Sequence, residues 1–207
     1  MTNRRTADAA SWMWLARVAG MAATALALTG CGSFYVDTAT KDVPVAQYQK
    51  PAQPKPVQLM FEFQTKGALN TRATDALKAQ IGEQVKTSGL FSEVQDKAVP
   101  NGAMLSIVLN NVPVDDNAFG KGFVTGLTFG LAGSQVTDGY ICTATYVTPG
   151  QMAPVVKTAR HAIHTTLGAS AAPPNAVKSE SLEAAVRTMT RQIISTTLND
   201  LSAEVAR

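Results

Sequence analysis

The sequence predicts an α+β domain in which an antiparallel or mixed sheet carries two helices on one face. Short apolar runs typical of strands alternate with two longer segments that have apolar residues at helical spacing. We find no internal repeat, and the strand-rich middle of the chain argues against a helical bundle. The expected order is β-α-β-β-β-β-α over residues 57–207, a length that suits one domain.

The domain is expected to begin with a strand and a helix. VQLMFEF at 57–63 is a short, nearly continuous apolar run, as in a buried strand. In the segment 70–89, apolar residues fall four positions apart, as on one face of a helix. Asn70 or Thr71 can cap the start of this helix, and Gly89 can supply a left-handed end.

The remaining elements follow the same reasoning. LFSEVQ is expected to form a short strand or turn, and AMLSIVLNNV at 103–112 a strand. YICTATYVT at 140–148 and VVKTARHAIHTTL at 155–167 flank Pro149-Gly150, a strong turn signal, so we expect an antiparallel hairpin. After the break GASAAPPN, helical spacing predicts a final helix from about 178 to 206.

The N-terminus has the features of a secretory signal peptide. Residues 1–17 contain three arginines against one acidic residue, and Val18–Leu28 is an uninterrupted apolar stretch. A helix that spans a bilayer needs about 20 apolar residues, so this stretch is too short. A basic start, a short apolar centre and a small-residue end indicate export. The alternative is a buried core helix, which the position of Arg17 and the clustered small residues disfavour.

The end of this leader contains a recognisable motif. Leu28-Thr29-Gly30-Cys31 resembles the bacterial lipobox. The resemblance implies cleavage between Gly30 and Cys31, a thioether-linked diacylglycerol on the Cys31 sulfur and a third acyl chain on the new amine. Each buried methylene contributes about 0.8 kcal/mol, so two or three chains hold a protein on a membrane where one would not.

The resemblance also implies where the protein resides. In lipoproteins, an aspartate directly after the cysteine retains the protein at the inner membrane, whereas Gly32 and Ser33 follow here. This implies sorting to the outer membrane, with the domain facing the periplasm. We therefore divide the chain into a cleaved leader at 1–30, a lipidated N-terminus with a proline-rich tether at 31–56, and the domain at 57–207.

Charge and cysteine content narrow the function classes further. The leader carries three arginines and one aspartate, so its removal lowers the formal net charge from +3 to about +1. A chain this close to neutral offers no basic surface for nucleic acid. With Cys31 acylated, Cys142 has no intrachain partner. Cys142 lies in a strand-like run without neighbouring cations, so we expect a small core residue rather than a reactive thiol.

The most unusual stretch is FGKGFVTGLTFGLAGS at 119–134. Its small residues recur every four positions, as in closely packed membrane helices, while its apolar residues also fit one face of a strand. Three interpretations stay open: a glycine-rich loop or edge element packed on the domain, a surface that contacts a partner or membrane, and insertion as part of an oligomeric ring. The candidate contact residues are Gly122, Phe123, Gly126, Leu127, Phe129 and Gly130.

The sequence offers few residues for chemistry. His161 and His164 are the only histidines, and three positions apart on a strand they point to opposite faces, so they cannot grip one metal. We expect one solvent-facing and one hydrogen-bonded histidine. Asp115-Asp116 is better explained by a turn than by a calcium or acid–base site. No hydrolase, zinc-protease or P-loop motif is present, so we expect no enzyme, no cofactor and no metal.

The whole domain is more loosely similar to small lipoproteins of Gram-negative envelopes, through SGLFSEV, GLTFGLAGSQVTDGY and HAIHTTLG. The leading hypothesis is a lipid-anchored outer-membrane protein whose periplasmic domain binds another envelope protein or lipid without catalysis. A competing hypothesis is an oligomeric membrane-active or pore-forming subunit that uses 119–133. A lipid or glycolipid carrier, with an apolar cavity between sheet and helices, and an enzyme without a local motif are also compatible with the sequence.

Overall fold

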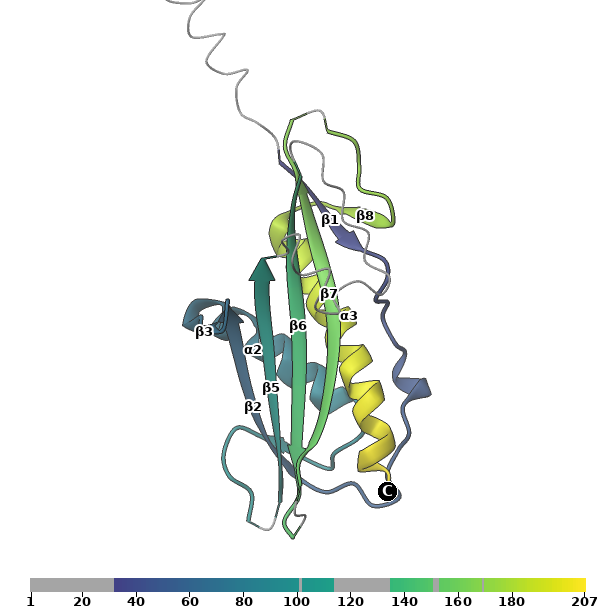
Figure 1. Ribbon diagram of the computed structural model, residues 1–207. Coiled ribbons are helices and arrows are strands. Elements are labelled where there is room, and N and C mark those ends of the chain that lie inside the picture. Colours follow the sequence, from purple (N-terminus) through teal and green to yellow (C-terminus); the bar gives the residue numbers. More distant parts are fainter. Residues whose placement is uncertain (1–31, 101, 114–134, 151–152, 169) are drawn as a thin grey trace, which may run out of the picture. The chain divides into compact units, whose positions relative to one another are not determined.

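The computed structural model describes residues 32–100, 102–113, 135–150, 153–168 and 170–207. All of its elements belong to one unit, Ser33–Arg207 (Figure 1). Eight strands form one mixed sheet and two α-helices pack against it, which confirms the predicted α+β class. The elements are β1 Ser33–Asp37, the 3-10 turn η1 Val45–Gln47, β2 Val57–Thr65, β3 Ala68–Leu69, α2 Thr71–Thr87, β4 Val94–Gln95, β5 Ala103–Pro113, β6 Gln135–Val147, β7 Val155–Thr166, β8 Ala176–Ser179 and α3 Leu182–Val205.

The strand order is β3-β2-β5-β6-β7-β1-β8, with β4 paired to β2. β2 and β5 are parallel because α2 lies between them in the chain and returns it to the starting end of the sheet. β5, β6 and β7 are antiparallel neighbours. The predicted hairpin is confirmed: β6 and β7 pair over twelve residues, and Gly150 adopts the positive φ of 86° that a turn requires.

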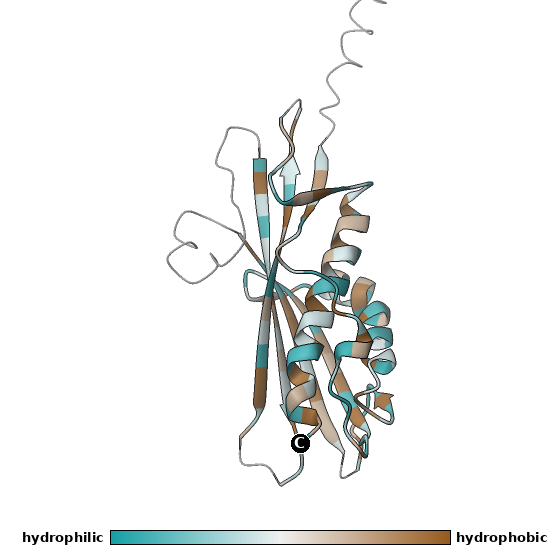
Figure 2. Cartoon of the chain, turned by 90° about the vertical axis from the view of Figure 1, so that its right-hand side faces the viewer, coloured by the Kyte–Doolittle hydropathy of each residue, from teal (hydrophilic) through white to brown (hydrophobic). Residues whose placement is uncertain are grey.

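Both helices cover the same face of the sheet (Figure 2). Asn70 caps α2 by accepting a hydrogen bond from the Ala73 amide at 3.0 Å, and Gly89 follows its end with a φ of 68°, as the sequence predicts. The core lies between this face and the helices. Its fully buried side chains include Ile81, Leu105, Ile107, Leu109, Met189, Ile193, Leu198 and Leu201, and Cys142 is buried among them as expected.

The two helices run side by side and start at the same end of the sheet (Figure 1). The Gln80 side chain donates to the Arg187 carbonyl at 2.9 Å, and Gln84 donates to the Arg191 carbonyl at 3.0 Å. Moving four residues along α2, from Gln80 to Gln84, moves the contact four residues forward along α3, from Arg187 to Arg191. The two helices are therefore parallel. Both N-termini therefore point toward the end where β2 finishes.

The predicted tether at 31–56 is wrong. β1 pairs antiparallel with β7 on one side, through Ser33↔Thr166 to Val36↔Ile163, and with β8 on the other side, through Phe34↔Ser179 to Asp37↔Ala176. The folded domain therefore begins at Ser33 and not at residue 57. Since both edges of β1 are paired, its backbone is held as firmly as that of an interior strand.

The rest of that segment, residues 38–56, lies along α3, and we call it the strap. Tyr48 is buried, and its hydroxyl donates to the Ser195 carbonyl at 3.0 Å. The amide of Val43 donates to the Ser195 hydroxyl, and that of Gln49 to the Ser202 hydroxyl, each at 3.0 Å. Prolines prevent the strap from joining a sheet ladder. Serine side chains of α3 therefore satisfy backbone groups that would otherwise face solvent.

The start of the final helix also differs from the prediction. Residues 176–179 form the edge strand β8, and α3 begins at Leu182 after the Ser181 hydroxyl accepts from the Ala184 amide at 3.1 Å. Glu183 lies in the first turn, where it complements the positive end of the helix dipole. Within the described ranges, no helix has the length and apolar character needed to cross a membrane.

Candidate functional site

The residues with the clearest relation to the predicted anchor lie at one end of the sheet, which we call the anchor end. Here Ser33 of β1 and Gln135 of β6 both pair with Thr166 of β7. Cys31 precedes Ser33 by two positions, so only Gly32 lies between them and their Cα atoms are at most about 7 Å apart. The opposite end of the sheet, where Val57, Val147 and Val155 lie, we call the far end.

The anchor end carries exposed apolar side chains. On β6, Val136 shares the helix-bearing face with Tyr140 and Cys142, but those two are buried whereas Val136 is 56% exposed. Leu167 follows β7 directly and Val177 lies on β8. We call Val136, Leu167, Val177 and Leu182 the apolar patch; all four are exposed.

A buried polar cluster occupies the opposite face of the same end. His164 lies between two partners: its Nδ1 is 2.9 Å from the Thr137 hydroxyl on β6, and its Nε2 is 3.3 Å from a carboxylate oxygen of Asp37 on β1. The other Asp37 oxygen accepts from the Ala39 amide at 2.7 Å. Both His164 and Asp37 are buried. The cluster therefore ties three strands together at the anchor end.

His161 lies on the helix-bearing face. Its Nδ1 accepts from the Ala162 amide at 2.8 Å, so Nε2 carries the proton and donates to the Gln192 side chain of α3 at 2.8 Å. Burial lowers the pKa of His161 below its usual value, against smaller opposing effects of the Gln192 and Ala162 hydrogen bonds. The prediction of one solvent-facing histidine is wrong, because both are buried by partners distant in sequence.

The order Thr137–His164–Asp37 is that of a hydroxyl, an imidazole and a carboxylate, as in hydrolase triads. The base and the carboxylate are fully buried, however, whereas a catalytic base must exchange protons with a substrate. The geometry favours a structural role for this cluster. Among the residues that the structure describes, no group of three or more metal-binding side chains could hold an ion.

A groove opens between the sheet and the starts of the two helices. It measures about 660 Å³, and Phe63, Tyr140, Leu182 and Val186 supply its apolar walls. Arg72 also lines it, and both helix N-termini direct positive partial charge toward it. Below the groove, Leu77, Ile81 and Met189 are buried and fill the space between sheet and helices. The continuous apolar cavity expected of a lipid carrier is therefore reduced to an open groove at one end.

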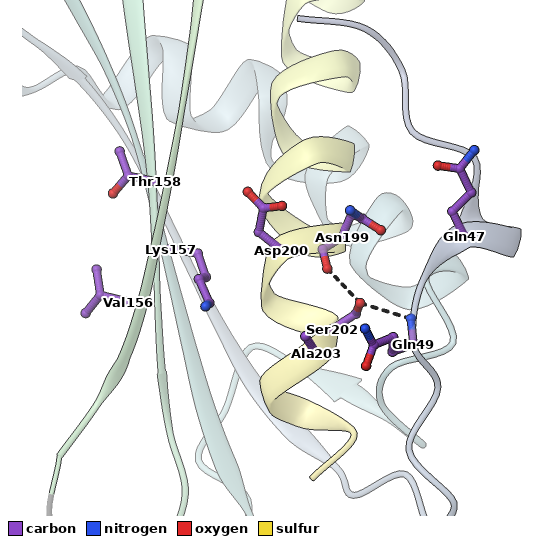
Figure 3. Close-up of a pocket in the computed structure, with 9 residues that line it drawn as sticks. All are labelled: Gln47, Gln49, Val156, Lys157, Thr158, Asn199, Asp200, Ser202 and Ala203. Atoms are coloured by element: carbon purple, nitrogen blue, oxygen red, sulfur yellow. Dashed lines mark hydrogen bonds between the residues drawn. The ribbon is translucent and has the colours of Figure 1, made fainter. Parts of the chain in front are cut away.

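A second hollow of about 700 Å³ lies between the strap, β7 and α3 (Figure 3). Ser202 in its wall joins α3 to the strap: its hydroxyl donates to the Asn199 carbonyl at 2.6 Å and accepts from the Gln49 amide at 3.0 Å. Lys157 reaches out of β7 to form an ion pair of 3.0 Å with Glu204 on α3. These contacts hold the strap and α3 in place, and we assign the hollow a structural role.

Most of the site residues that the sequence singles out lie outside the described residues. This applies to Leu28, Thr29, Gly30 and Cys31, to the candidate contacts Gly122, Phe123, Gly126, Leu127, Phe129 and Gly130, and to the Asp115-Asp116 pair. The strands on either side of 114–134 end at Pro113 and begin at Gln135, both toward the anchor end. Cys142 is described, and burial raises the pKa of its thiol to about 12, as suits an inert core residue.

Sequence reasoning missed the apolar patch and the Asp37–His164 contact. The alternation in SFYVD was a usable signal for β1, because Phe34 and Val36 face one side and Tyr35 and Asp37 the other. The prolines that follow made the whole segment resemble a linker. The contact itself joins residues 127 positions apart, which no local pattern shows.

The comparisons with known proteins give structural neighbours only. No family model and no curated protein matches the sequence. Rare lipoprotein B from Shewanella oneidensis aligns with a TM-score of 0.39 and 14% identity over 72% of this chain and 96% of its own. The PelC dodecamer from Paraburkholderia phytofirmans aligns with a TM-score of 0.35 and 14% identity over 86% and 99%. Since both TM-scores lie below 0.5, we base the function of this chain on its own residues.

Proposed function

We propose that this protein is a lipoprotein of the Gram-negative outer membrane, held by acyl chains on Cys31. Its domain faces the periplasm and binds another envelope component without catalysing a reaction. The proposal combines the lipobox resemblance of Leu28-Thr29-Gly30-Cys31 with the position of β1. The short apolar stretch before the motif is a leader rather than a membrane span.

One observation carries the proposal: β1 starts at Ser33, two residues after Cys31, and is paired on both sides. Because the fold begins at Ser33, loss of residues 1–30 would remove none of the paired strand β1. Cleavage before Cys31 removes everything up to the edge of the fold and leaves a two-residue connector. An acylated sulfur at that point brings the whole anchor end to the bilayer surface.

A binding role without catalysis agrees with the buried groups. His164 and Asp37 of the Thr137–His164–Asp37 cluster are buried, and Ser202 and Lys157 at the second hollow already hold α3 through a hydrogen bond and an ion pair. The groove by the helix N-termini and the exposed apolar side chains at the anchor end remain as contact surfaces. The pore-forming hypothesis depends on 119–133, which lies outside the described residues.

A lipid carrier is a second candidate, which the groove favours. The apolar walls suit an acyl chain. Arg72 and two helix N-termini suit an anionic head group, since the one acidic residue that lines the groove, Glu183, is paired with Arg187. Because the core below is filled, such a ligand would lie in the groove and not inside the domain. Native mass spectrometry after incubation with phosphatidylglycerol should show a bound lipid that Val186→Asp removes. Absence of bound lipid in the unmodified protein would exclude this candidate.

Radiolabelled palmitate tests the anchor in cells. The unmodified protein should incorporate label and sediment with outer-membrane fractions in a density gradient. Cys31→Ala should incorporate none, whereas Cys142→Ala, which removes the buried thiol, should incorporate as much as the unmodified chain. Label that persists in Cys31→Ala, or no label in the unmodified protein, would contradict the proposed anchor.

A further inference from the structure

We propose that the apolar patch of Val136, Leu167, Val177 and Leu182 lies in the interfacial layer of the membrane that holds Cys31. The domain would then stand with its anchor end on the bilayer and keep a fixed orientation, instead of moving freely on its acyl chains. This inference rests on the proposed lipid anchor and adds a second, noncovalent contact with the same membrane.

The chain between Cys31 and Ser33 is short. One residue, Gly32, links Cys31 to Ser33, so two Cα–Cα steps limit their separation to about 7 Å. β1 cannot extend this reach, because Ser33 is paired with Thr166 and Phe34 with both Thr165 and Ser179. Peeling β1 from the sheet would break its ladders with β7 and β8 together. The acyl chains therefore hold the anchor end itself at the membrane surface.

The pairing of four strands determines where the apolar side chains lie. Val136, Thr165, Phe34 and Ser179 form one row across β6, β7, β1 and β8 on the helix-bearing face. Leu167 lies two residues beyond this row, at the extreme of the anchor end, whereas Val177 lies two residues before it on β8, level with Val36 and Ile163. Leu182 starts α3 just after β8. β6, β8, α3 and the residue after β7 thus bring exposed apolar side chains to the half of the sheet where β1 begins at Ser33.

The side chains of the apolar patch are accessible to a membrane. The patch residues Val136, Leu167, Val177 and Leu182 are 56%, 51%, 62% and 47% exposed, although strand alternation continues the core-facing side toward the anchor end. Among the charged residues near the patch, Lys178 and Glu180 have opposite signs, and Glu183 is paired with Arg187 at 3.0 Å, so the signs are mixed next to an anionic bilayer. Apolar side chains that reach the head-group boundary insert about 5–10 Å. A bilayer is the partner that the adjacent anchor brings to this surface.

β7 offers a matched pair of positions for a test. Leu167 and Val156 are 51% and 52% exposed, but they lie at opposite ends of the strand. Eleven residues at about 3.3 Å each separate them by about 36 Å. Cys142 is buried with a raised pKa, so a thiol-reactive probe on the native protein selects the introduced cysteine. Leu167→Cys and Val156→Cys therefore report on the two ends with the same chemistry.

The experiment uses the full lipidated protein reconstituted in phosphatidylethanolamine–phosphatidylglycerol vesicles, with an environment-sensitive fluorophore at either cysteine. Co-sedimentation with the vesicles reports the anchor, and quenching by lipids spin-labelled near the head group reports orientation. We expect the probe at 167 to be quenched at least about threefold more than the probe at 156. Adding Val177→Asp and Val136→Asp should reduce that quenching while co-sedimentation and the melting temperature are retained.

The outcomes separate the two claims. Protein that co-sediments with equal, weak quenching at both positions would overturn the membrane contact and leave the anchor intact. Shielding of the probe at 167 without quenching, together with a doubled particle mass, would assign the patch to a second copy of the chain and also overturn it. Protein that fails to co-sediment would contradict the anchor, and the inference with it.

Discussion

The far end and the anchor end of β6 and β7 carry the same alternation of side chains, yet they are covered in opposite ways. Toward the far end, Cys142, Ala144 and Ala159 are buried against α3 and the other face is open, as at Val156. At the anchor end, His164 is buried on that other face, and the helix-bearing face changes from buried at Ile163 to exposed at Val136. The strand pattern is the same at both ends, and the two ends differ only in which side chains the neighbouring elements cover.

The buried core and the exposed patch are therefore expected to serve different purposes: the core stabilises the fold, and the patch contacts the membrane. The largely apolar core under α2 and α3 supplies most of the favourable burial, because the hydrophobic contribution grows with the apolar area removed from water. The anchor end combines exposed apolar side chains with an internal Asp37–His164 contact that fixes β1 to the sheet. We therefore expect variants of the core to change folding and variants of the patch to change membrane contact.

The largest expected effect is on the core. Ile193→Ala, on a fully buried residue of α3, should lower the free energy of unfolding by about 3–4 kcal/mol through lost burial and a cavity. Leu167→Ala, in the patch, should change it by less than about 0.5 kcal/mol. Urea unfolding of both variants measures the difference. Similar losses would contradict the separation of stability from contact.

Asp37→Ala should come next, with a loss of about 2 kcal/mol. The carboxylate accepts from the Ala39 amide and faces His164 within a buried cluster, so its removal deprives buried groups of an acceptor. Asp37→Asn keeps an oxygen for one of these contacts and should cost less. Thermal unfolding of the two variants provides the measurement, and equal melting temperatures for Asp37→Ala and the unmodified protein would show that the cluster does not hold β1.

The lowered pKa of His161 predicts that the stability of the fold depends on pH. Its pKa is lowered in the folded state, so above the ordinary histidine value of about 6.5 it is neutral in both states and contributes no slope. As the pH falls through about 6.5, the unfolded chain binds the proton first and stability decreases, by at most about 1.4 kcal/mol per pH unit. Urea midpoints between pH 7.5 and 5.5 should fall less steeply in His161→Gln, because this variant lacks the imidazole whose pKa burial lowers. Identical slopes would contradict this assignment.

The smallest expected effect concerns the strap. Tyr48→Phe removes the hydrogen bond to the Ser195 carbonyl but keeps the buried ring, so the cost should be about 1 kcal/mol. Hydrogen exchange should increase at the Val43 and Gln49 amides, which Ser195 and Ser202 bind. Unchanged exchange at both amides would mean that the strap is held independently of Tyr48.

Much of the fold could be predicted because its signals are local. Asn70 and Gly89 mark the ends of α2, and Pro149-Gly150 marks the β6–β7 turn. β1 could not be predicted in this way, since its partners on β7 and β8 lie more than 100 positions away. The burial of His164 depends on the same distant pairing. The patch was also beyond local reasoning, because exposure of Val136 depends on where two helices begin in space.

The measurement that tests the lipid anchor most directly is the intact mass of the protein purified from the membranes of a Gram-negative host. The account predicts a chain that starts at Cys31, 177 residues long after loss of the leader from 207, with added mass for a diacylglyceryl group and one amide-linked acyl chain. Top-down fragmentation should locate both additions on Cys31. An unmodified Cys31, or a chain that retains residues 1–30, would contradict the account.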